Sequence, residues 1–424
     1  MQIAICGMLD EREEALGLLK EQIEQRGHKA ILIDFSIGTG AIEPTLKADI
    51  TCDEVARAGG MSTAKIGETL AKERDRATSA MAQGLAKKVH ELYQAGKLQG
   101  IIAIGGMTGT MISLPAMRAL PFGVPKLLIS STAALPAYAG TLAQYFGLSD
   151  ITVMHSVIDT VGMNALLRNL MVNGAGAICG MVENHKAFEQ KTKPTIAITE
   201  FGFCDKGAHY VRELLQKDYS FVSFHAQGLG DRAVEHLVGQ GLFDGFIDLV
   251  PSSLSDYLLG GNRASGPGRL EAAGKAGIPY ILAPCGFDMI SCGPIERRDK
   301  GDPLWVSRKL AERKMLLQDA ARVQARTTAE EVRTVARAVA EKLNRYPDKK
   351  LVKFLIPTRG FSSLSVEGAA LYEPETDKAF VDELRKQLHP ERRIIEVDTH
   401  INTPEFAEAI GLALREAFTL REKP

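Results

Sequence analysis

Hydrophobic residues along the chain fall into short, nearly continuous runs that alternate with longer amphipathic stretches. Each run has the length of a β-strand and lacks regular polar alternation, which is typical of strands buried in a parallel sheet. The amphipathic stretches between the runs, such as 74–94, predict helices that cover both faces of that sheet. The predicted strands lie at 2–6, 30–35, 100–105, 123–131, 151–157, 194–199, 220–226, 243–249, 277–284, 351–357 and 393–398.

The strand pattern starts afresh after a polar segment near 183–193, which predicts two domains. A chain of 424 residues is also longer than one ordinary hydrophobic core requires. "KLQGIIAI" followed by "GVPKLLIS" resembles "LFDGFIDL" followed by "GIPYILAP", although any doubly wound domain yields such pairs. We expect an α/β fold of two doubly wound, Rossmann-like domains with mainly parallel sheets, over 1–185 and 190–424. The expected ligand cleft lies between them, at the carboxyl ends of the strands.

Two segments depart from this pattern. The stretch 36–70 lacks strong periodicity and is expected to be a long excursion after the second strand. The stretch 295–324 is strongly charged, which predicts a surface helical insertion or an oligomer contact rather than a nucleic-acid site.

Composition and charge argue against several classes of partner. The 51 basic and 52 acidic residues give a formal net charge of −1, so nothing favours nucleic acid. No apolar run reaches the length of a membrane span, and the N-terminus does not resemble a signal peptide. The six cysteines form no C-x-x-C pair and, with the histidines, no zinc spacing. We therefore expect a cytoplasmic protein with reduced thiols, no metal site and no membrane or nucleic-acid partner.

Two glycine-rich loops follow predicted strands and precede predicted helices. In "GGMTGT" (105–110) the glycines let backbone N–H groups approach an anion, and the helix start adds positive charge. The loop matches neither the Walker pattern nor G-x-G-x-x-G, so a tight strand–helix turn explains it about equally well. "HAQGLGDRA" (225–233) occupies a similar place in the second half. The candidate ligand-binding residues of the two loops are Gly105, Gly106, Thr108, Gly109, Thr110, Gly228, Gly230 and Arg232.

Further polar residues stand at other strand ends. Asp34 is a candidate for binding a ribose hydroxyl, whereas Arg269, expected to open a helix, and Arg359 are candidates for clamping a phosphate or carboxylate. Structural roles compete with each of these, because strand-end histidines and aspartates often only cap or brace the backbone. Since parallel strands end on one side of a sheet, the convergence favours a phosphate- or carboxylate-bearing ligand. The candidate acid–base residues are His225, Asp288 and His400.

Several stretches resemble one known family. "IIAIGGMTGTMISLPAMRALPFGVPKLLIS", "SDITVMHSVIDTVGMN" and "GRLEAAGKAGIPYILAPCGFDM" are similar to the Tm-1-like ATP-binding family, also called UPF0261. The resemblance covers nearly the whole chain in order, and it implies two Rossmann-like domains, ATP as ligand with or without Mg²⁺, and a homodimer. A plant member blocks tomato mosaic virus RNA replication by binding the viral replication protein. For bacterial members the resemblance implies no settled reaction.

The chain departs from the family's usual loops. The usual G-G-S-G-G-T reads "GGMTGT" here, and the usual T-L-D-T-K reads "MLDER" (8–12), which keeps Asp10 as a candidate ligand-binding residue and lacks the lysine. The usual G-T-G-G-R-A reads "GLGDRA" (228–233), where Asp231 would repel an anion.

Three functions remain open on the sequence. The first is a nucleotide-binding protein with ATP in the cleft. The second is a metabolic enzyme that acts on a small sugar acid or acyl carboxylate through His225, Asp288, His400 and Arg359. The third is a protein-interaction or inhibitor module. Turnover discriminates the first two, because a binder shows affinity without product.

Overall fold

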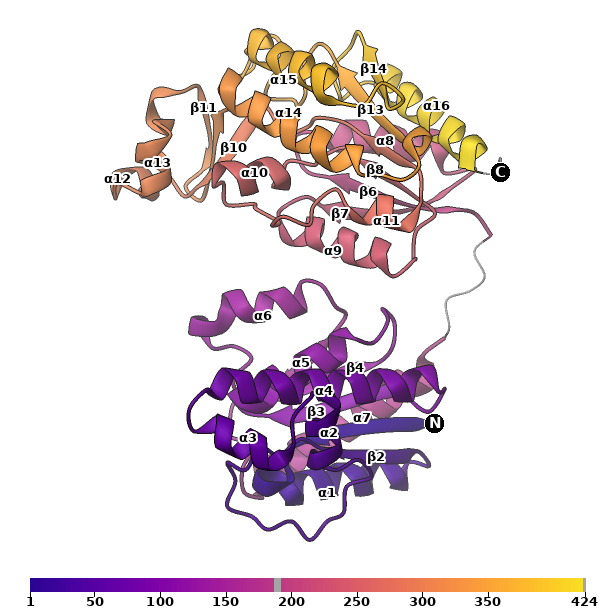
Figure 1. Ribbon diagram of the computed structural model, residues 1–424, viewed down its shortest axis with the longest axis vertical. Helices are drawn as coiled ribbons and strands as arrows, with labels where there is room; N and C mark the ends of the chain where they lie inside the picture. Colours follow the sequence, from indigo (N-terminus) through magenta and orange to yellow (C-terminus); the bar gives the residue numbers. More distant parts are fainter. Residues whose placement is uncertain (187–191, 422–424) are drawn as a thin grey trace. The chain divides into compact units, whose positions relative to one another are not determined.

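The chain divides into two compact units, Met1–Glu189 and Gln190–Pro424, each built around its own sheet (Figure 1). The computed structural model describes residues 1–186 and 192–421. In both units the main sheet is parallel and helices cover its two faces. The predicted α/β fold with mainly parallel sheets is therefore confirmed.

Within residues 1–186, the strands form a five-stranded parallel sheet in the order β2-β1-β3-β4-β5. The strands are β1 (Gln2–Gly7), β2 (Lys29–Asp34), β3 (Gly100–Gly105), β4 (Lys126–Ser130) and β5 (Thr152–His155). The helices are α1 (Leu9–Gln25), α2 (Cys52–Ala58), α3 (Thr63–Leu70), α4 (Arg74–Gln94), α5 (Met107–Arg118), η1 (Pro136–Tyr138), α6 (Ala139–Phe146) and α7 (Ala165–Asn184).

Alternate residues of each central strand pack against helices on opposite faces of this sheet. Ile3 and Ile5 of β1 pack in the cluster under α1 and α7. Ala4 and Cys6 pack in the cluster under α2, α4 and α5. Successive side chains of a strand point to opposite faces, so covering both faces requires apolar residues at every position. The continuous apolar runs in the sequence have this origin, and every residue of β3 is buried.

Two glycines set the close approach of α2 and α4. A Cβ atom on Gly84 would lie 1.9 Å from the carbonyl oxygen of Val55. A Cβ atom on Gly59 would lie 1.9 Å from the carbonyl oxygen of Ala80. Any other residue at these positions forces the two helices apart, because the obstacle is backbone rather than a movable side chain.

Gly84→Ala is therefore expected to lower the free energy of unfolding of the first unit by about 1–3 kcal/mol. Gly67→Ala is the matched control, because no atom lies within 4 Å of the added Cβ in α3. That control is expected to stabilise the unit by up to about 1 kcal/mol through helix propensity. Thermal unfolding followed by circular dichroism should shift in opposite directions for the two variants, and a shift in the same direction would contradict the close helix crossing.

Within residues 192–421, a six-stranded parallel sheet has the order β14-β13-β9-β8-β6-β7, and a small antiparallel sheet has the order β10-β12-β11. The strands are β6 (Thr195–Glu200), β7 (Ser220–His225), β8 (Gly245–Asp248), β9 (Tyr280–Leu282), β10 (Met289–Gly293), β11 (Met315–Asp319), β12 (Arg322–Arg326), β13 (Val352–Pro357) and β14 (Arg393–Val397). The helices are α8 (Asp205–Leu215), α9 (Leu229–Gly239), α10 (Ser253–Leu259), α11 (Ala272–Ala276), α12 (Glu296–Asp299), α13 (Pro303–Ser307), η2 (Leu310–Glu312), α14 (Ala329–Asn344), η3 (Lys349–Leu351), α15 (Pro374–Gln387) and α16 (Pro404–Arg421).

The second unit also buries both faces of its main sheet. Phe246, Tyr280 and Phe354 pack in one cluster with α9, α14 and α15, and α14 and α15 lie side by side (Figure 1). Ile198 and Ile247 pack on the other face with α8 and α16.

The first five strand positions of the two main sheets follow one order. The order β2-β1-β3-β4-β5 in the first unit corresponds to β7-β6-β8-β9-β13 in the second. The similar sequence pairs fall on β3 and β4 and on β8 and β9, which hold equivalent positions. In each unit the strand order reverses between the second and third positions of this series, at β1/β3 and at β6/β8. Doubly wound sheets bind ligands beyond the carboxyl ends of the strands at such a point.

Three segments differ from the sequence-based expectation. The stretch 36–70 contains α2 and α3, whose two turns are too short for a clear periodic signal, and Thr51 and Glu54 form a capping box on α2. In 295–324 only the first part is helical. The second part forms β11 and β12, which pair antiparallel with each other, so the prediction of a helical insertion is wrong there. Helix α7 has the length and hydropathy of a membrane span, but Met171 and Ile178 pack in the core under the sheet.

Candidate functional site

The glycine-rich loop forms a tight turn from β3 into α5. Gly105 ends the strand, and Gly106 caps the helix without offering a side-chain acceptor to its first N–H groups. A Cβ atom on Gly105 would lie 2.8 Å from Cα of Gly109, so strand end and helix start touch. The hydroxyl of buried Thr110 lies 2.7 Å from that of Ser130, which anchors the helix start on β4. The loop is thus both the tight turn and an open helix N-terminus, which attracts anions.

Arg12 lies beside this helix start. Its side chain is 4% exposed, and its Nη2 lies 3.3 Å from the position that a Cβ of residue 106 would take. Its Nε donates to Oγ1 of Thr160 at 2.7 Å, and its Nη1 donates to the carboxylate of Glu11. The backbone leaves helical geometry at Arg12, with φ −136° and ψ 28°. Since β1 and β3 are neighbours, Arg12 and Gly106 meet where the strand order of the first sheet reverses.

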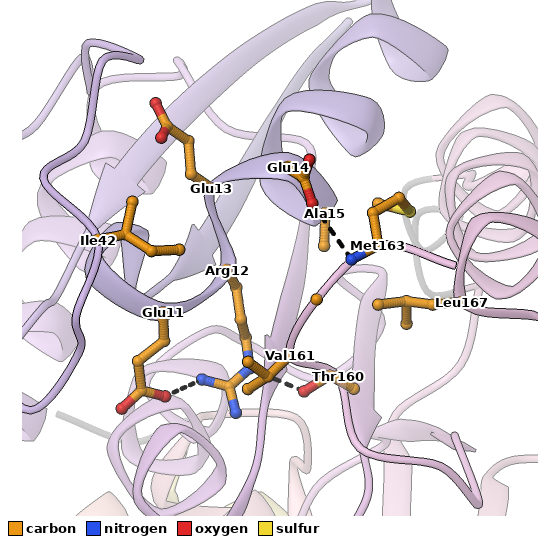
Figure 2. Close-up of a pocket in the computed structure, with 11 residues that line it drawn as sticks. Glu11, Arg12, Glu13, Glu14, Ala15, Ile42, Thr160, Val161, Met163 and Leu167 are labelled. Carbon is orange, nitrogen blue, oxygen red and sulfur yellow. Dashed lines mark hydrogen bonds and ion pairs between the residues drawn. The ribbon is translucent and has the colours of Figure 1, made fainter. Parts of the chain in front are cut away.

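Arg12 also lines a cavity of about 370 Å³ (Figure 2). Figure 2 shows its guanidinium between Glu11 and the segment that carries Thr160 and Val161. The cavity has an apolar part and an acidic part, which suits a ligand with an apolar ring and several hydroxyl groups. The apolar part is formed by Ala15, Ile42, Val161, Met163 and Leu167, and the acidic part by Glu11, Glu13 and Glu14.

The glutamates of the cavity tie two loops to α1. Glu13 accepts hydrogen bonds from the backbone N–H of Thr45, at 2.6 Å, and from that of Leu46. The bond from Leu46 is the main cause that lowers the pKa of Glu13 below its ordinary value. Glu14 accepts a bond of 3.2 Å from the backbone N–H of Met163, as Figure 2 shows. The acidic residues therefore build the walls of the cavity.

Three more polar side chains lie at the start of α5. Nη2 of Arg74 donates to Oγ1 of Thr108 at 3.3 Å. Oγ of Ser131 lies 3.9 Å from the Cβ position of residue 106. Together with Arg12 they give the helix N-terminus two guanidinium groups and two hydroxyls, which are the donors that phosphate groups accept from.

Asp10 and Asp34 brace the turn that presents Arg12. Asp34 Oδ1 accepts from the backbone N–H of Leu9 at 3.2 Å and of Ser36 at 2.9 Å. Asp10 Oδ2 accepts from the backbone N–H of Gly40 at 3.0 Å. These bonds connect the segment after β1 to the segment after β2. The predicted ribose contact of Asp34 competes with this bracing role.

The second glycine loop is closed by its own aspartate. Asp231 Oδ2 accepts from the backbone N–H of Gly228 at 2.9 Å, so the carboxylate takes the place of an anion at the start of α9. A Cβ atom on Gly230 would lie 2.0 Å from the carbonyl oxygen of His225, which makes this glycine a packing requirement. Gly228 has φ +84°, a conformation that favours glycine, and Arg232 is half-buried in α9.

Arg269 does not open a helix, because α11 begins at Ala272. Its guanidinium is fully buried and pairs with Asp231 at 3.2 Å, Glu235 at 3.1 Å and Asp248 at 2.8 Å. Three carboxylates thus occupy the donors of Arg269. The structure gives this residue an internal role in place of the predicted clamp on a ligand.

The predicted acid–base residues are not brought together. His225 ends β7 and His400 follows β14, and these strands are the opposite edges of the second main sheet. Five inter-strand steps of about 4.8 Å place the two edges about 24 Å apart. Asp288 is fully buried and accepts from the backbone N–H of Gly286 at 3.0 Å and from Ser362 Oγ at 2.5 Å.

Arg359 and His400 do share a cavity, of about 300 Å³, with Tyr372 and Asp377. Arg359 donates to both carboxylate oxygens of exposed Asp398, at 2.8 and 2.6 Å. Burial raises the pKa of Asp377 to about 7. Among the described residues, no three His, Cys, Asp or Glu side chains are grouped so as to hold a metal ion.

Comparison with known proteins shows which family this chain belongs to. The UPF0261 N-terminal domain, of an uncharacterised protein family, matches residues 1–187, and the UPF0261 C-terminal domain matches residues 193–418. The chain belongs to the UPF0261 family. A UPF0261 protein of Clostridium tetani is 36% identical over 417 residues, which cover 97% of this chain and 98% of that protein.

A plant relative and a solved structure are also similar. The ToMV resistance protein Tm-1 of Solanum lycopersicum is 32% identical over 350 residues, which cover 81% of this chain and 44% of that protein. The glycosyltransferase SsfS6 of Streptomyces is 10% identical, with a TM-score of 0.20 and coverage of 97% of this chain and 99% of that one. That structural likeness carries no argument about function.

Arg12 is the residue that sequence reasoning missed in this UPF0261 protein. It stands where the family resemblance leads one to expect lysine, so the position keeps its positive charge. The comparison of residues 8–12 with the family's usual loop was the one sequence feature that could have indicated Arg12. Its contact with Gly106, however, depends on the backbone break in α1 and on the pairing of β1 with β3.

Proposed function

We propose that the first unit of this UPF0261 protein binds a nucleotide such as ATP, with or without Mg²⁺. The phosphates lie at the start of α5, and the base and ribose lie in the cavity of about 370 Å³ that Arg12 lines. One observation carries the proposal: the buried guanidinium of Arg12 borders both the helix start at Gly106 and the cavity. ATP is also the ligand that the family resemblance implies.

The electrostatics of the two regions support this orientation. The helix N-terminus, Arg12 and Arg74 present positive charge and hydroxyl donors to the phosphates. Glu11, Glu13 and Glu14 lie in the cavity, where they would repel phosphate but accept hydrogen bonds from ribose hydroxyls. A volume of about 370 Å³ lies within the usual range of small-molecule sites.

The proposal includes a cytoplasmic, homodimeric protein, because ATP is abundant in the cytoplasm and C2 dimers are the commonest oligomers. The enzyme alternative, in the form that the sequence predicts, is supported less well. His225, Asp288 and His400 do not converge, and the pair that shares a cavity is Arg359 and His400.

Calorimetric titration with ATP, AMP and adenosine tests the proposal. Affinity for the wild type is expected to fall as phosphates are removed. Thr108→Asp is expected to weaken ATP binding at least about tenfold, because it puts a carboxylate in the first turn of α5. Thr108→Asn has nearly the same shape without the charge and is expected to bind ATP almost as the wild type does.

An aspartate in the first turn generally stabilises a helix, so the circular dichroism of Thr108→Asp is expected to match that of the wild type, which separates loss of binding from unfolding of α5. Binding of the wild type to none of the three compounds, or equal affinity of both Thr108 variants for ATP, would refute the phosphate site at α5.

A further inference from the structure

A largely buried arginine in the second unit forms no ion pair with any described residue. Arg263 is 7% exposed, and across the described residues its guanidinium makes no hydrogen bond or ion pair. Its Cζ atom lies 5.5 Å from the ring centroid of Phe201. Arg269, in the same glycine-rich loop, is surrounded by three carboxylates. A buried charge without a partner is costly, so its retention needs a reason.

Asp256 acts on Arg263 electrostatically but, among the described residues, forms no ion pair with its guanidinium. Asp256 accepts from the backbone N–H of Arg263 at 3.1 Å and from that of Ser291 at 3.2 Å. Burial also raises the pKa of Asp256 to about 7, which reduces its negative charge at neutral pH. Burial is the main cause that lowers the pKa of Arg263, the charge of Asp256 opposes that shift, and the positive charge of Arg322 adds to it.

Arg263 lies where a doubly wound sheet binds ligands. Phe201, under its guanidinium, directly follows β6, and β6 and β8 are the strands at which the order of the second sheet reverses. The same loop carries a second group without a partner, because the hydroxyl of Ser265 is buried and unbonded among the described residues.

We infer that Arg263 and Ser265 form an oxyanion site in the second unit, which binds the carboxylate or phosphate group of a small molecule. The guanidinium carbon lies over the Phe201 ring, and the N–H donors, which make no hydrogen bond among the described residues, can pair with two oxygens of one ligand group. The bound oxyanion neutralises the buried charge and accepts the hydroxyl proton of Ser265. The site is independent of the proposed nucleotide site, which lies in the other unit.

The single tryptophan, Trp305, is buried in the core of the second unit, so its fluorescence reports unfolding of that unit. We would follow thermal unfolding of the full chain with inorganic phosphate or malonate against chloride at matched ionic strength. The Arg12→Met background removes the proposed site of the first unit from the measurement. At an anion concentration ten times the dissociation constant, the melting temperature is expected to rise by about 3–6 °C. The anion that raises the melting temperature more, phosphate or malonate, identifies phosphate or carboxylate as the preferred group.

Arg263→Met is expected to abolish the shift and, without anion, to unfold at the same or a higher temperature than the wild type. Arg263→Lys keeps the charge without the planar fork and is expected to keep a reduced shift. Neither anion stabilising the wild type, or an equal shift in Arg263→Met, would overturn the site. So would a large loss of stability in anion-free Arg263→Met, which would make Arg263 a structural residue.

Discussion

Arg12→Met is expected to weaken ATP binding roughly 100-fold, because a guanidinium that donates two bonds to phosphate contributes about 3 kcal/mol. Methionine keeps an unbranched apolar stem that can stay buried but removes the guanidinium and its charge beside Gly106. The bond to Thr160 is lost as well, so circular dichroism must show that the first unit still folds. Titration calorimetry with ATP gives the dissociation constants.

Arg12→Lys is the control for charge. The family resemblance leads one to expect lysine at this position, so this variant should retain most of the affinity that Arg12→Met loses. Equal affinity of folded Arg12→Met and the wild type would remove Arg12 from the site. Equal loss of binding in the lysine and methionine variants would instead mean that the planar fork, and not charge alone, is required.

Arg269→Met is expected to lower the free energy of unfolding of the second unit by about 3–5 kcal/mol. The substitution leaves the carboxylates of Asp231, Glu235 and Asp248 without their shared cation, in a site where Arg269 is completely buried. Urea unfolding followed by the fluorescence of Trp305 measures the loss in this unit. Arg415→Met is the matched control, because Arg415 pairs with Asp218 at the surface and should contribute at most about 1 kcal/mol.

The loss in Arg269→Met is also expected to depend on pH. Burial already raises the pKa values of Asp231 and Glu235, and removal of the cation raises them further. The native variant then keeps protons that the unfolded chain releases above about pH 4, so its stability falls as pH rises. The deficit against the wild type should therefore be smaller at about pH 5 than at about pH 8. A deficit that does not change with pH would show that lost packing, rather than unpaired charge, causes the instability.

The sequence by itself determined the class of fold and the position of one loop. Continuous apolar runs such as 101–104 require cover on both faces, which only helices on either side of a parallel sheet provide. Glycines at 105 and 106 directly after such a run marked the turn into α5. These signals are local, because neighbouring residues determine whether a strand is buried and where a helix starts.

Only the tertiary structure decided which charged residues are free to bind a ligand. Arg263 and Arg269 are six residues apart in one glycine-rich loop, yet three carboxylates surround the second, whereas no carboxylate in the described part of the chain forms an ion pair with the first. Likewise, the order of the strands separates His225 from His400 and brings Arg12 to Gly106. The physical reason is that ion pairing depends on distances of a few ångströms in space. Those distances follow from strand order and loop packing between residues far apart in the chain.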